Sequence, residues 1–309
     1  MKCGKCEQKA AIHLKHHNLA LCKDHFPEWI CIQTERIIKK YGMFRKEERL
    51  LVAVSGGKDS LSLWDILWKL GYQADGLYLD LGIDGDVSYS KRSGELAQVF
   101  ATQRGLKLSV IDIKARYGES IPEMGARTKR GHQKPCSQCG LVKRYLLNKE
   151  ALDGKYDAIL TGHNLDDEAA FLFSNLTHWS MQYLGRQYPL LPATTGFARK
   201  AKPLCQFYER ETTAYAYLSG IEYVYAECPY SKGSKQLRNK LYLNMLEDEQ
   251  TGFKSQFYSG YLRALEAGIF PQPQESPETL EQKRCANCGQ PTSSGGLCTF
   301  CRLVNVQRD

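Results

Sequence analysis

The sequence predicts an α/β fold, a doubly wound parallel sheet flanked by a small zinc module at each end. Short aliphatic stretches alternate with helical stretches along the middle of the chain, which is typical of such a sheet. The expected strands cover 50–54, 74–83, 106–113 and 156–162, and helical stretches lie near 91–104 and 140–151. Paired cysteines at both ends and a glycine-rich loop after the first strand complete the pattern.

Composition bounds the class of protein. With 309 residues, 42% of them apolar and 25% charged, the chain can form a sizeable core with one or two small appended modules. The N-terminus lacks the apolar segment of a signal peptide, and the longest aliphatic run, 50–54, is too short to cross a membrane. We therefore expect a cytoplasmic protein without a membrane partner. In a reducing compartment its twelve cysteines are expected to bind metals or do chemistry rather than form disulfides.

The first strand and the helix after it enclose the first functional motif. Residues 50–54 form an aliphatic run typical of a buried parallel strand. The helix is expected to end at Gly71, and its apolar residues recur at helical spacing: Leu61, Trp64, Leu67 and Trp68. Between strand and helix, backbone amides and hydroxyls surround a helix N-terminus, where the helix dipole favours an anion. This loop consists of Ser55, Gly56, Gly57, Lys58, Asp59 and Ser60.

The loop predicts a phosphate site. It is not of the Walker type, because Val52 and Asp59 stand where that motif requires a glycine and a serine or threonine. The pattern S-G-G-K-D-S resembles instead the pyrophosphate loop of the ATP pyrophosphatases. These Rossmann-like enzymes split ATP between its α and β phosphates and hand AMP to a substrate oxygen. The resemblance implies ATP as a cofactor, and the alternative is a chance Gly-Gly turn.

The carboxyl ends of the expected strands form the predicted binding edge. In doubly wound sheets the loop at 55–60, the turn after Leu79 and the segment after Leu160 converge there. From this topology we expect backbone groups near Leu79 to Leu81 to read an adenine edge.

The segment T-G-H-N-L-D-D-E, residues 161–168, predicts a further part of this site. Gly162 lets a ligand approach the backbone, and Asp166, Asp167 and Glu168 stand at the expected start of a helix. Carboxylate oxygens in this position suit Mg²⁺ that bridges ATP phosphates. The alternative is that they only cap the helix and interact with its dipole.

The N-terminal cysteines predict a structural zinc site. Two ligand pairs have the spacing that closes a tetrahedron around Zn²⁺: Cys3, Cys6, Cys22 and His25. His13, His16 and His17 are alternative fourth ligands.

The C-terminal cysteines predict a second Zn²⁺ site with four thiolates: Cys285, Cys288, Cys298 and Cys301. A polar stretch with three prolines, 271–284, reads as a linker in front of it. The expected organisation is a zinc module at 1–30, a catalytic domain at 31–270, the linker, and a zinc module at 285–309. Closed zinc sites of this kind hold structure or contact RNA rather than catalyse.

A further pair, Cys136 and Cys139, finds no second pair that would complete a zinc site. Together with the motifs at 55–60 and 161–168, a lone later cysteine before proline and both zinc modules, it resembles the tRNA 2-thiouridine synthetases. That family includes enzymes that thiolate ribothymidine in the T loop and enzymes that thiolate the wobble uridine. The likeness covers nearly the whole chain. Over the core alone, the chain is also similar to the tRNA 2-thiocytidine synthetases, which lack this pair of zinc modules.

The resemblance implies an iron–sulfur site. In the family a distant cysteine joins the Cys-x-x-Cys pair, and Cys228 in A-E-C-P-Y-S matches that position. Three thiolates can hold a [4Fe-4S] cluster in which one iron has no protein ligand and can bind hydrosulfide. The residues alone do not choose Cys228 over Cys31 or Cys205. Cys205 is expected to be a buried apolar residue, and Cys31 is expected to pack beneath the first zinc module.

The reaction implied by the resemblance is ATP-dependent 2-thiolation of uridine or ribothymidine in tRNA. The base O2 attacks the α-phosphorus of ATP, pyrophosphate leaves, and sulfur from the cluster then displaces AMP. Lys58 and Lys143 are candidate stabilisers of phosphate charge. Lys143, four residues after Cys139, and Asp167 also match positions of functional importance in the family. For Lys143 the alternative is an exposed helix lysine.

Positive charge supports an RNA partner. The net charge is +8, and two basic stretches, 126–134 and 230–240, flank the proposed cluster cysteines in sequence. Either stretch alone is also typical of a solvated surface. The target base is expected to flip out of the tRNA to reach the pocket.

Several alternatives stay open at this point. Instead of a 2-thiouridine synthetase, the protein could function like a 2-thiocytidine synthetase or as another ATP pyrophosphatase that acts on a small molecule. A third alternative is a zinc-module RNA-binding adaptor without enzymatic activity. Sulfur can also travel as a persulfide on Cys136 or Cys139 that Cys228 resolves. The sulfur donor is either sulfide or a ubiquitin-like thiocarboxylate carrier, and the modified position is undecided. From the family we expect a homodimer.

Overall fold

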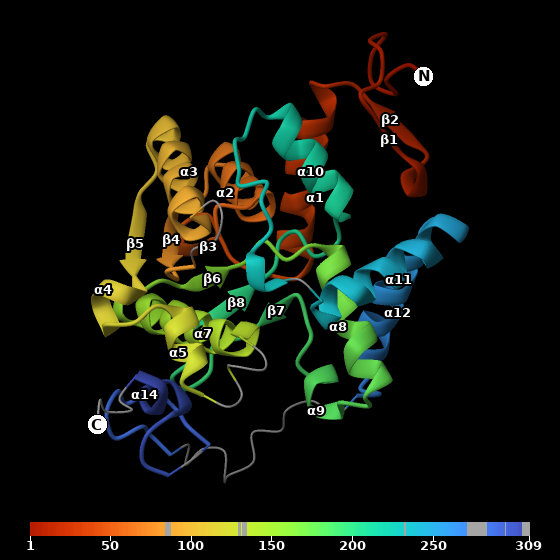
Figure 1. The fold of residues 1–309 in the computed structure, drawn as a ribbon. Coiled ribbons are helices and arrows are strands. Elements are labelled where there is room, and N and C mark those ends of the chain that lie inside the picture. The colour runs from red at the N-terminus through yellow and green to blue at the C-terminus, as the bar shows by residue number, and fades with distance from the viewer. Residues whose placement is uncertain are drawn as a thin grey trace.

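The computed structural model describes residues 1–83, 88–128, 131, 135–231, 233–270, 283–293 and 295–304. A six-stranded sheet forms its centre, with the strand order β5-β4-β3-β6-β8-β7 (Figure 1). The neighbouring strands that the structure describes are parallel, except that β7 runs antiparallel to β8. The strands are β3 (Leu50–Val54), β4 (Ala74–Asp80), β5 (Leu108–Asp112), β6 (Ala158–Leu160), β7 (Leu190–Leu191) and β8 (Arg199–Ala201).

This sheet confirms the predicted doubly wound fold. The helices α2 (Lys58–Lys69), α3 (Tyr89–Arg104) and α7 (Pro135–Asp153) occupy the expected helical stretches. The first strand agrees with its predicted bounds, whereas the other three are shorter than predicted. β7 and β8 were not predicted, because they have two and three residues and because Arg199 and Lys200 interrupt the apolar run that marks a buried strand.

Alternate residues of β3 belong to two hydrophobic cores. Leu50, Val52 and Val54 pack in the core that also contains α1 (His25–Lys40), α2 and α10 (Glu209–Leu218). Leu51 packs in the other core, with Val142 of α7. Figure 1 shows α1, α2, α3 and α10 on one side of the sheet and α4 (Ile113–Tyr117), α5 (Ile121–Ala126) and α7 on the other.

The apolar face of α2 is narrower than the sequence pattern predicted. Trp64 is completely buried and stacks on Phe100, with ring centroids 5.5 Å apart. Trp68 is 45% exposed and has the Arg104 guanidinium 5.8 Å from its ring. Helical spacing alone therefore does not decide which of the two tryptophans is buried.

Three helices form a separate layer beside the sheet. α8 (Leu165–Thr177) packs against α11 (Lys235–Glu249) and α12 (Phe253–Glu266), and the short α9 (Met181–Leu184) follows α8. The start of α8 lies next to the loop after β3, because the Asn164 side chain, which caps α8, donates a hydrogen bond to Asp59. No helix in the described part of the chain is long and apolar enough to cross a membrane.

The two cysteine modules lie at opposite ends of the molecule (Figure 1). The N-terminal one contains β1 (Ile12–Leu14) and β2 (Leu19–Leu21), and α1 continues from its last ligand, His25, into the central core. The C-terminal one contains α14 (Thr299–Val304) and shares the core of α7. Most of the expected linker, 271–282, lies outside the described residues.

Candidate active site and metal centres

The glycine-rich loop connects β3 to α2, at the point where the strand order reverses between β4 and β6. Ser60 holds its shape: the Ser55 N–H donates to Ser60 Oγ over 3.0 Å, and that hydroxyl donates to the Gly57 carbonyl, also over 3.0 Å. Gly57 is the N-cap of α2, and no described side chain caps this helix. The N–H groups of its first turn are therefore available to a phosphate.

Two glycines allow close approach of backbone segments at this loop. Gly56 has φ +74°, and a Cβ there would lie 2.3 Å from the carbonyl oxygen of Ser93 in α3. A Cβ on Gly162 would lie 2.7 Å from the carbonyl carbon of Asp59. Only glycine fits at both positions. At Gly162 this lets the segment after β6 pack directly against the loop after β3, and at Gly56 it lets α3 pack against the same loop. The two predicted motifs thus meet in space.

A chain of alternating charges runs from the loop to α8. Lys58 Nζ lies 2.9 Å from the Asp59 carboxylate and 2.8 Å from the Glu209 carboxylate. Glu209 also pairs with Lys240 at 2.9 Å, and Lys240 pairs with Asp167 at 2.6 Å. Burial opposes ionisation of Glu209, but the charges of Lys240 and Lys58 prevail and lower its pKa to about 2. The network stays ionised at neutral pH and holds Lys58 at the mouth of the loop.

Asp59 is anchored by polar groups from two other elements. Its Oδ1 accepts hydrogen bonds from the Asn164 side chain, over 3.2 Å, and from the Thr212 hydroxyl. Asn164 precedes α8, and Thr212 lies on α10. The carboxylate of Asp59 is therefore oriented by groups far from it in sequence.

The paired carboxylates at the start of α8 have different surroundings. Asp167 forms a reciprocal capping box with Asn164, over 3.1 Å in both directions, and its other interaction is with Lys240. Asp166 is buried, pairs with Lys254 and accepts a hydrogen bond from the Glu209 N–H over 2.7 Å. Helix capping, the alternative considered from sequence, describes part of the role of Asp167, and the contacts of Asp166 are structural.

The turn after β4, which was expected to bind adenine through its backbone, is partly occupied by contacts within the protein. The Leu79 side chain is buried in the core that contains α7. The carbonyl of Leu81 accepts a hydrogen bond from the Ile121 N–H over 3.0 Å. Recognition of adenine by backbone groups at Leu79 to Leu81 stays a prediction.

Three cysteines line one small cavity, in keeping with the family resemblance that selected Cys228. Cys136 and Cys139 lie in the first turns of α7, and Cys228 precedes a short 3₁₀ helix, Pro229–Ser231. The remaining lining residues are Ile83, Ile121, Pro122 and Tyr230. The Cys136 thiol donates to the Tyr230 carbonyl over 3.2 Å. Burial, followed by the charges of Cys139 and Cys228, raises the pKa of Cys136.

These three thiols are not grouped as closely as the ligand atoms of the two terminal modules. Among the described residues, two other groups of side chains have all their ligand atoms within 4.8 Å of one another, and these three cysteines do not form such a group. A tetrahedral zinc site needs sulfurs about 4 Å apart. A [4Fe-4S] cluster binds each thiolate through a different iron and so accepts a wider arrangement.

The other two isolated cysteines lie elsewhere. Cys205 is completely buried in the core, and burial raises its pKa, which confirms that it is a buried residue. Cys31 lies on α1 with its sulfur 3.9 Å from the Tyr215 hydroxyl. Neither lines the cavity of Cys136, Cys139 and Cys228.

Lys143 lies on α7, one turn after Cys139, and is half-buried rather than exposed. Its charge counteracts part of the rise in the pKa of Cys136. Its ammonium has no hydrogen-bond or ion-pair partner among the described residues. A cation without a partner beside three thiols is available to a charged substrate.

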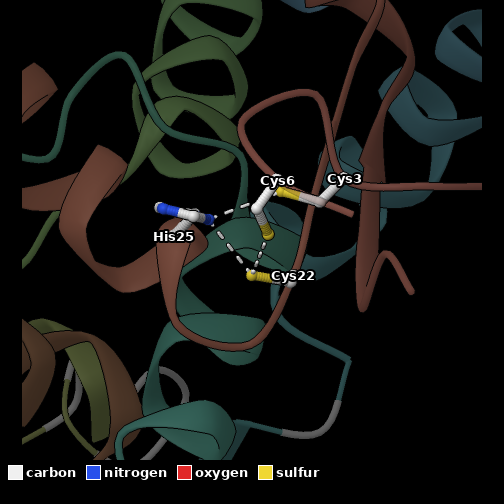
Figure 2. A group of neighbouring side chains, drawn as sticks. All are labelled: Cys3, Cys6, Cys22 and His25. Atoms are coloured by element: carbon white, nitrogen blue, oxygen red, sulfur yellow. Dashed lines mark hydrogen bonds between the residues drawn. The ribbon is translucent and has the colours of Figure 1, made fainter. Parts of the chain in front are cut away.

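The predicted N-terminal zinc ligands converge as expected (Figure 2). The Cys22 sulfur lies 3.3 Å from His25 Nδ1 and 3.9 Å from the Cys6 sulfur, and Cys3 lies 3.6 Å from His25 Nδ1. Burial raises the pKa of Cys3, but backbone N–H donors, led by that of Lys5, lower it to about 6. These separations fit a tetrahedral Zn²⁺ ion, whose bonds to sulfur are about 2.3 Å long.

The alternative histidine ligands are engaged in other contacts. His16 Nε2 faces the buried Glu211 carboxylate at 3.4 Å, and the His17 ring lies edge-on to Trp29. The group of ligand atoms within 4.8 Å contains His25 and not His13. The choice of His25 as the fourth ligand is thereby supported.

The four C-terminal cysteines also have sulfurs within 4.8 Å of one another. The Cys288 and Cys298 sulfurs are 3.8 Å apart. The Cys298 N–H donates to Cys285 over 3.2 Å, and although burial raises the pKa of Cys285, such N–H donors lower it to about 6. A stabilised thiolate at this position suits Zn²⁺.

Sequence reasoning missed several residues of the network around Lys58. Glu209 and Thr212 lie on α10, in a stretch without a recognisable motif. Lys240 was assigned to a basic stretch that faces RNA, but its side chain is only 18% exposed and pairs with two carboxylates. The available sequence signal for Glu209 is its position at the start of a helix. Acidic residues are common there because they interact favourably with the helix dipole, so the signal does not indicate a functional site.

Comparisons with known proteins agree with this site. Residues 2–27 match the N-terminal LIM domain of the 2-thiouridine synthetase TtuA, and residues 30–247 match the PP-loop domain. The chain is 45% identical, over 98% of its length and 91% of the relative, to the tRNA-5-methyluridine(54) 2-sulfurtransferase of Thermus thermophilus. It is 42% identical to the protein of the same name from Pyrococcus horikoshii, over 100% of the chain and 95% of the relative.

A solved structure shows the same architecture. The U34-tRNA thiolase NcsA from Methanococcus maripaludis, solved with its [4Fe-4S] cluster, matches with a TM-score of 0.78 and 25% identity, over 98% of this chain and 95% of that one. The matches span both the N-terminal module and the central domain. The chain therefore belongs to the TtuA family of tRNA 2-sulfurtransferases, within the PP-loop ATP pyrophosphatases.

Proposed function

We propose that this enzyme uses ATP to adenylate O2 of a uridine in tRNA and replaces that oxygen with sulfur at the site of Cys136, Cys139 and Cys228. One observation carries the proposal. The Val224 N–H donates to the Gly56 carbonyl over 3.1 Å, so the segment that leads to Cys228 packs on the phosphate loop. Four residues span at most about 14 Å, which keeps the ATP loop and the cysteine cavity within reach of one substrate base.

The first step is the transfer of AMP. The lone pair of uracil O2 attacks the α-phosphorus of ATP, an O–P bond forms, and the bond to the β-phosphate breaks to release pyrophosphate. The N-terminal N–H groups of α2 and Lys58 bind phosphate oxygens, and Lys143, whose charge acts on Cys136, offsets charge. We expect Mg²⁺ to accompany the phosphates, with Asp167 linked to the loop through Lys240.

The second step is the substitution at C2. Sulfide adds to C2, the bond from C2 to the adenylated oxygen breaks, and AMP leaves with that oxygen. A [4Fe-4S] cluster held by the three cysteines would supply the sulfide on the iron that lacks a protein ligand. The chain itself gives this cavity an apolar wall, formed by Ile83, Ile121 and Pro122. The proposed Zn²⁺ ions at the two terminal modules have structural roles.

The proposed base is 5-methyluridine 54. Relatives with 45% and 42% identity carry that position in their names, whereas the U34 thiolase is 25% identical. Sulfide and a ubiquitin-like thiocarboxylate carrier are both compatible with a three-thiol site in which Cys136 is exposed, so the assay must supply each donor separately. The exposed apolar face of α11, with Leu237, Leu241 and Met245, supports the expected homodimer, which light scattering can verify.

The decisive experiment uses protein purified without oxygen. Iron, acid-labile sulfide and zinc are measured per chain in the native protein, in Cys228→Ala and in the matched control Cys31→Ala. We expect about four irons in the native and control proteins and loss of iron in Cys228→Ala, with zinc unchanged in all three.

The same preparations are then incubated with ATP, a sulfur donor and tRNA that lacks the thiolation. We expect AMP and 2-thio-5-methyluridine from the native and control proteins, detected by mass spectrometry of the nucleosides. If the protein thiolates tRNA but contains no iron even after anaerobic reconstitution, the cluster hypothesis is wrong and sulfur must travel as a cysteine persulfide. Absence of thiolated nucleoside and of AMP from iron-loaded enzyme with either donor would refute the function itself.

A further inference from the structure

A second and larger cavity, about 670 Å³ in volume, lies between α7 and the C-terminal cysteine module. Its walls come from four parts of the chain: α7, Arg186 before β7, the segment around β8, and residues from the end of the linker and the C-terminal module. The volume falls in the range of cavities that bind nucleotide-sized ligands. Because this cavity does not contain the phosphate loop or the three cysteines, the proposed reaction leaves it without a role.

The charges of this cavity have a single sign. Its lining includes Arg144, Arg186, Lys200 and Lys283, and no aspartate or glutamate. None of these four side chains has a hydrogen-bond or ion-pair partner among the described residues. This contrasts with Lys58 and Lys240, which are neutralised by carboxylates in the site above. Four unneutralised cations around one concave surface create a strong positive potential.

Lys200 shows that these cations repel one another. Its position on β8 is half-buried, and burial together with the nearby charge of Arg144 lowers its pKa. Removal from water disfavours an ammonium that has no counterion. An anion in the cavity would supply the missing partner for both side chains.

The walls are fixed by packing and do not depend on a ligand. The rings of Tyr145 and Phe300 stack with centroids 3.7 Å apart and planes inclined by 8°. The buried Asn148 side chain donates to the Gly196 carbonyl and accepts from the Ala198 N–H, each over 2.9 Å. A Cβ on Gly196 would lie 2.4 Å from the Pro291 ring, so the module sits directly against this turn.

We propose that this cavity binds the sugar–phosphate backbone of the RNA substrate, at a distance from the nucleotide that is thiolated. Arg144 follows Cys139 by five residues on α7, so it lies about 8 Å further along the helix axis and about 140° around it from Cys139. The cavity therefore opens on a different face of α7 from the cysteine site, and a tRNA strand that runs around this helix can contact both. Arg144 and Arg186 are exposed at the surface, where a polymer can reach them, and Lys200 lies deeper.

The aromatic lining suits this occupant. Phe197 is 38% exposed and, with Tyr145, offers apolar surface beside the cations. Ribose and base edges pack on such surfaces while phosphate oxygens take the charged groups. In this arrangement the C-terminal cysteine module is one wall of the substrate site, and a Zn²⁺ ion held by its four cysteines would stabilise that wall. The inference rests on the proposed function, because it assumes that tRNA is the substrate.

The test compares two double variants in the full-length enzyme. Arg144→Gln/Lys200→Gln removes two cations of the cavity, and the control Lys114→Gln/Lys149→Gln removes two cations that are paired with carboxylates outside it. Both variants change the net charge equally. The readouts are the Kd for unmodified tRNA over a range of salt concentrations, the KM for ATP, and zinc per chain.

We expect the cavity variant to weaken tRNA binding about tenfold and to lower the slope of log Kd against log salt by about 1 to 2, roughly 0.7–0.9 for each phosphate that is no longer neutralised. The KM for ATP and the zinc content should match the native protein, which shows that the fold is intact. The control should keep the native Kd within about twofold, because its two lysines lie outside the cavity and are already paired with carboxylates.

Two outcomes would overturn the inference. Either the cavity variant binds tRNA as the control does, with the same salt slope, or the control loses as much affinity as the cavity variant and the effect is one of net charge alone. Failure of the proposed function looks different, since native enzyme would then produce no thiolated nucleoside at all. Thiolation by native enzyme with unchanged tRNA binding in the cavity variant would refute only the present inference.

Discussion

Lys58 and Glu209 lie 151 residues apart in the chain, yet their charged groups are 2.8 Å apart at the mouth of the phosphate loop. Glu209 holds a second lysine, Lys240, at 2.9 Å. One carboxylate on α10 therefore determines where two cations of the ATP site are placed. ATP phosphates must compete with this carboxylate, and the position of Lys58 depends on it.

Replacement of Glu209 should separate binding of ATP from its chemistry. In Glu209→Gln a negative charge beside the phosphates is removed, so the KM for ATP should not rise. Lys58 loses its fixed position, however, and we expect kcat for tRNA-dependent pyrophosphate release to fall at least about tenfold. Glu249→Gln, at an exposed position of α11, serves as the control and should leave both constants unchanged. A higher KM with an unchanged kcat would show that Glu209 does not position Lys58.

Gly56→Ala tests the close approach of the phosphate loop to α3. Gly56 and Gly71 have nearly the same backbone conformation, φ +74° and φ +75°, but a Cβ on Gly71 meets nothing within 4 Å. Both alanines bear the strain of positive φ, about 1–2 kcal/mol. Only the Cβ at position 56 also collides with a backbone carbonyl, so Gly56→Ala should raise the KM for ATP at least about tenfold and Gly71→Ala should not. Equal effects in the two variants would mean that the close approach to Ser93 is unimportant.

The pair of His16 and Glu211 predicts a dependence of stability on pH. Burial, against the Tyr208 N–H, raises the pKa of Glu211 to about 7 from its usual 4.5. Between these values the folded protein binds more protons than the unfolded chain, so this carboxyl destabilises the fold as pH rises through that window. Burial lowers the pKa of His16 to about 4, which has the opposite effect on stability below pH 6.5.

Glu211→Gln removes only the first of these two effects. The free energy of unfolding of the variant, relative to native protein, should rise from pH 4.5 to pH 7 by at most about 3 kcal/mol and then level off. Urea titrations at several pH values measure it, and Glu47→Gln, at an exposed position, should give a flat difference. A flat difference for Glu211→Gln as well would mean that Glu211 ionises normally in the fold.

The parts of the site that sequence predicted are local in the chain. The phosphate loop, residues 161–168 and both sets of zinc ligands lie within short segments, where residue type and spacing define the chemistry. Cys228 is the exception, because resemblance to a family selected it and the residues alone did not. The structure then placed it beside Cys136 and Cys139 in one cavity.

The parts that sequence missed depend on long-range contacts. Glu209 and Thr212 reach the loop through the packing of α10 on α2, which no local pattern encodes. Lys240 shows the converse error, since a basic stretch does not reveal which of its cations pair with carboxylates. The cavity of Lys200 was invisible for the same reason: its cations come from α7, β8 and two loops that the fold brings together.

Gly196→Ala tests whether the C-terminal module serves RNA binding through its position on the core. At this residue, with φ +80°, a Cβ would lie 2.4 Å from Pro291, whereas Gly220, with φ +63°, has open space. Both substitutions carry backbone strain of about 1–2 kcal/mol, but only Gly196→Ala must push the module away from Asn148 and β8. We expect faster trypsin cleavage after Lys283 or Arg284 and a severalfold higher Kd for tRNA in Gly196→Ala, with native values in Gly220→Ala. Zinc per chain should be equal in both, because the four thiols stay together within the module. Faster cleavage with unchanged tRNA affinity would show that the module can move without affecting the RNA site, and the cavity between them would lose its assigned role.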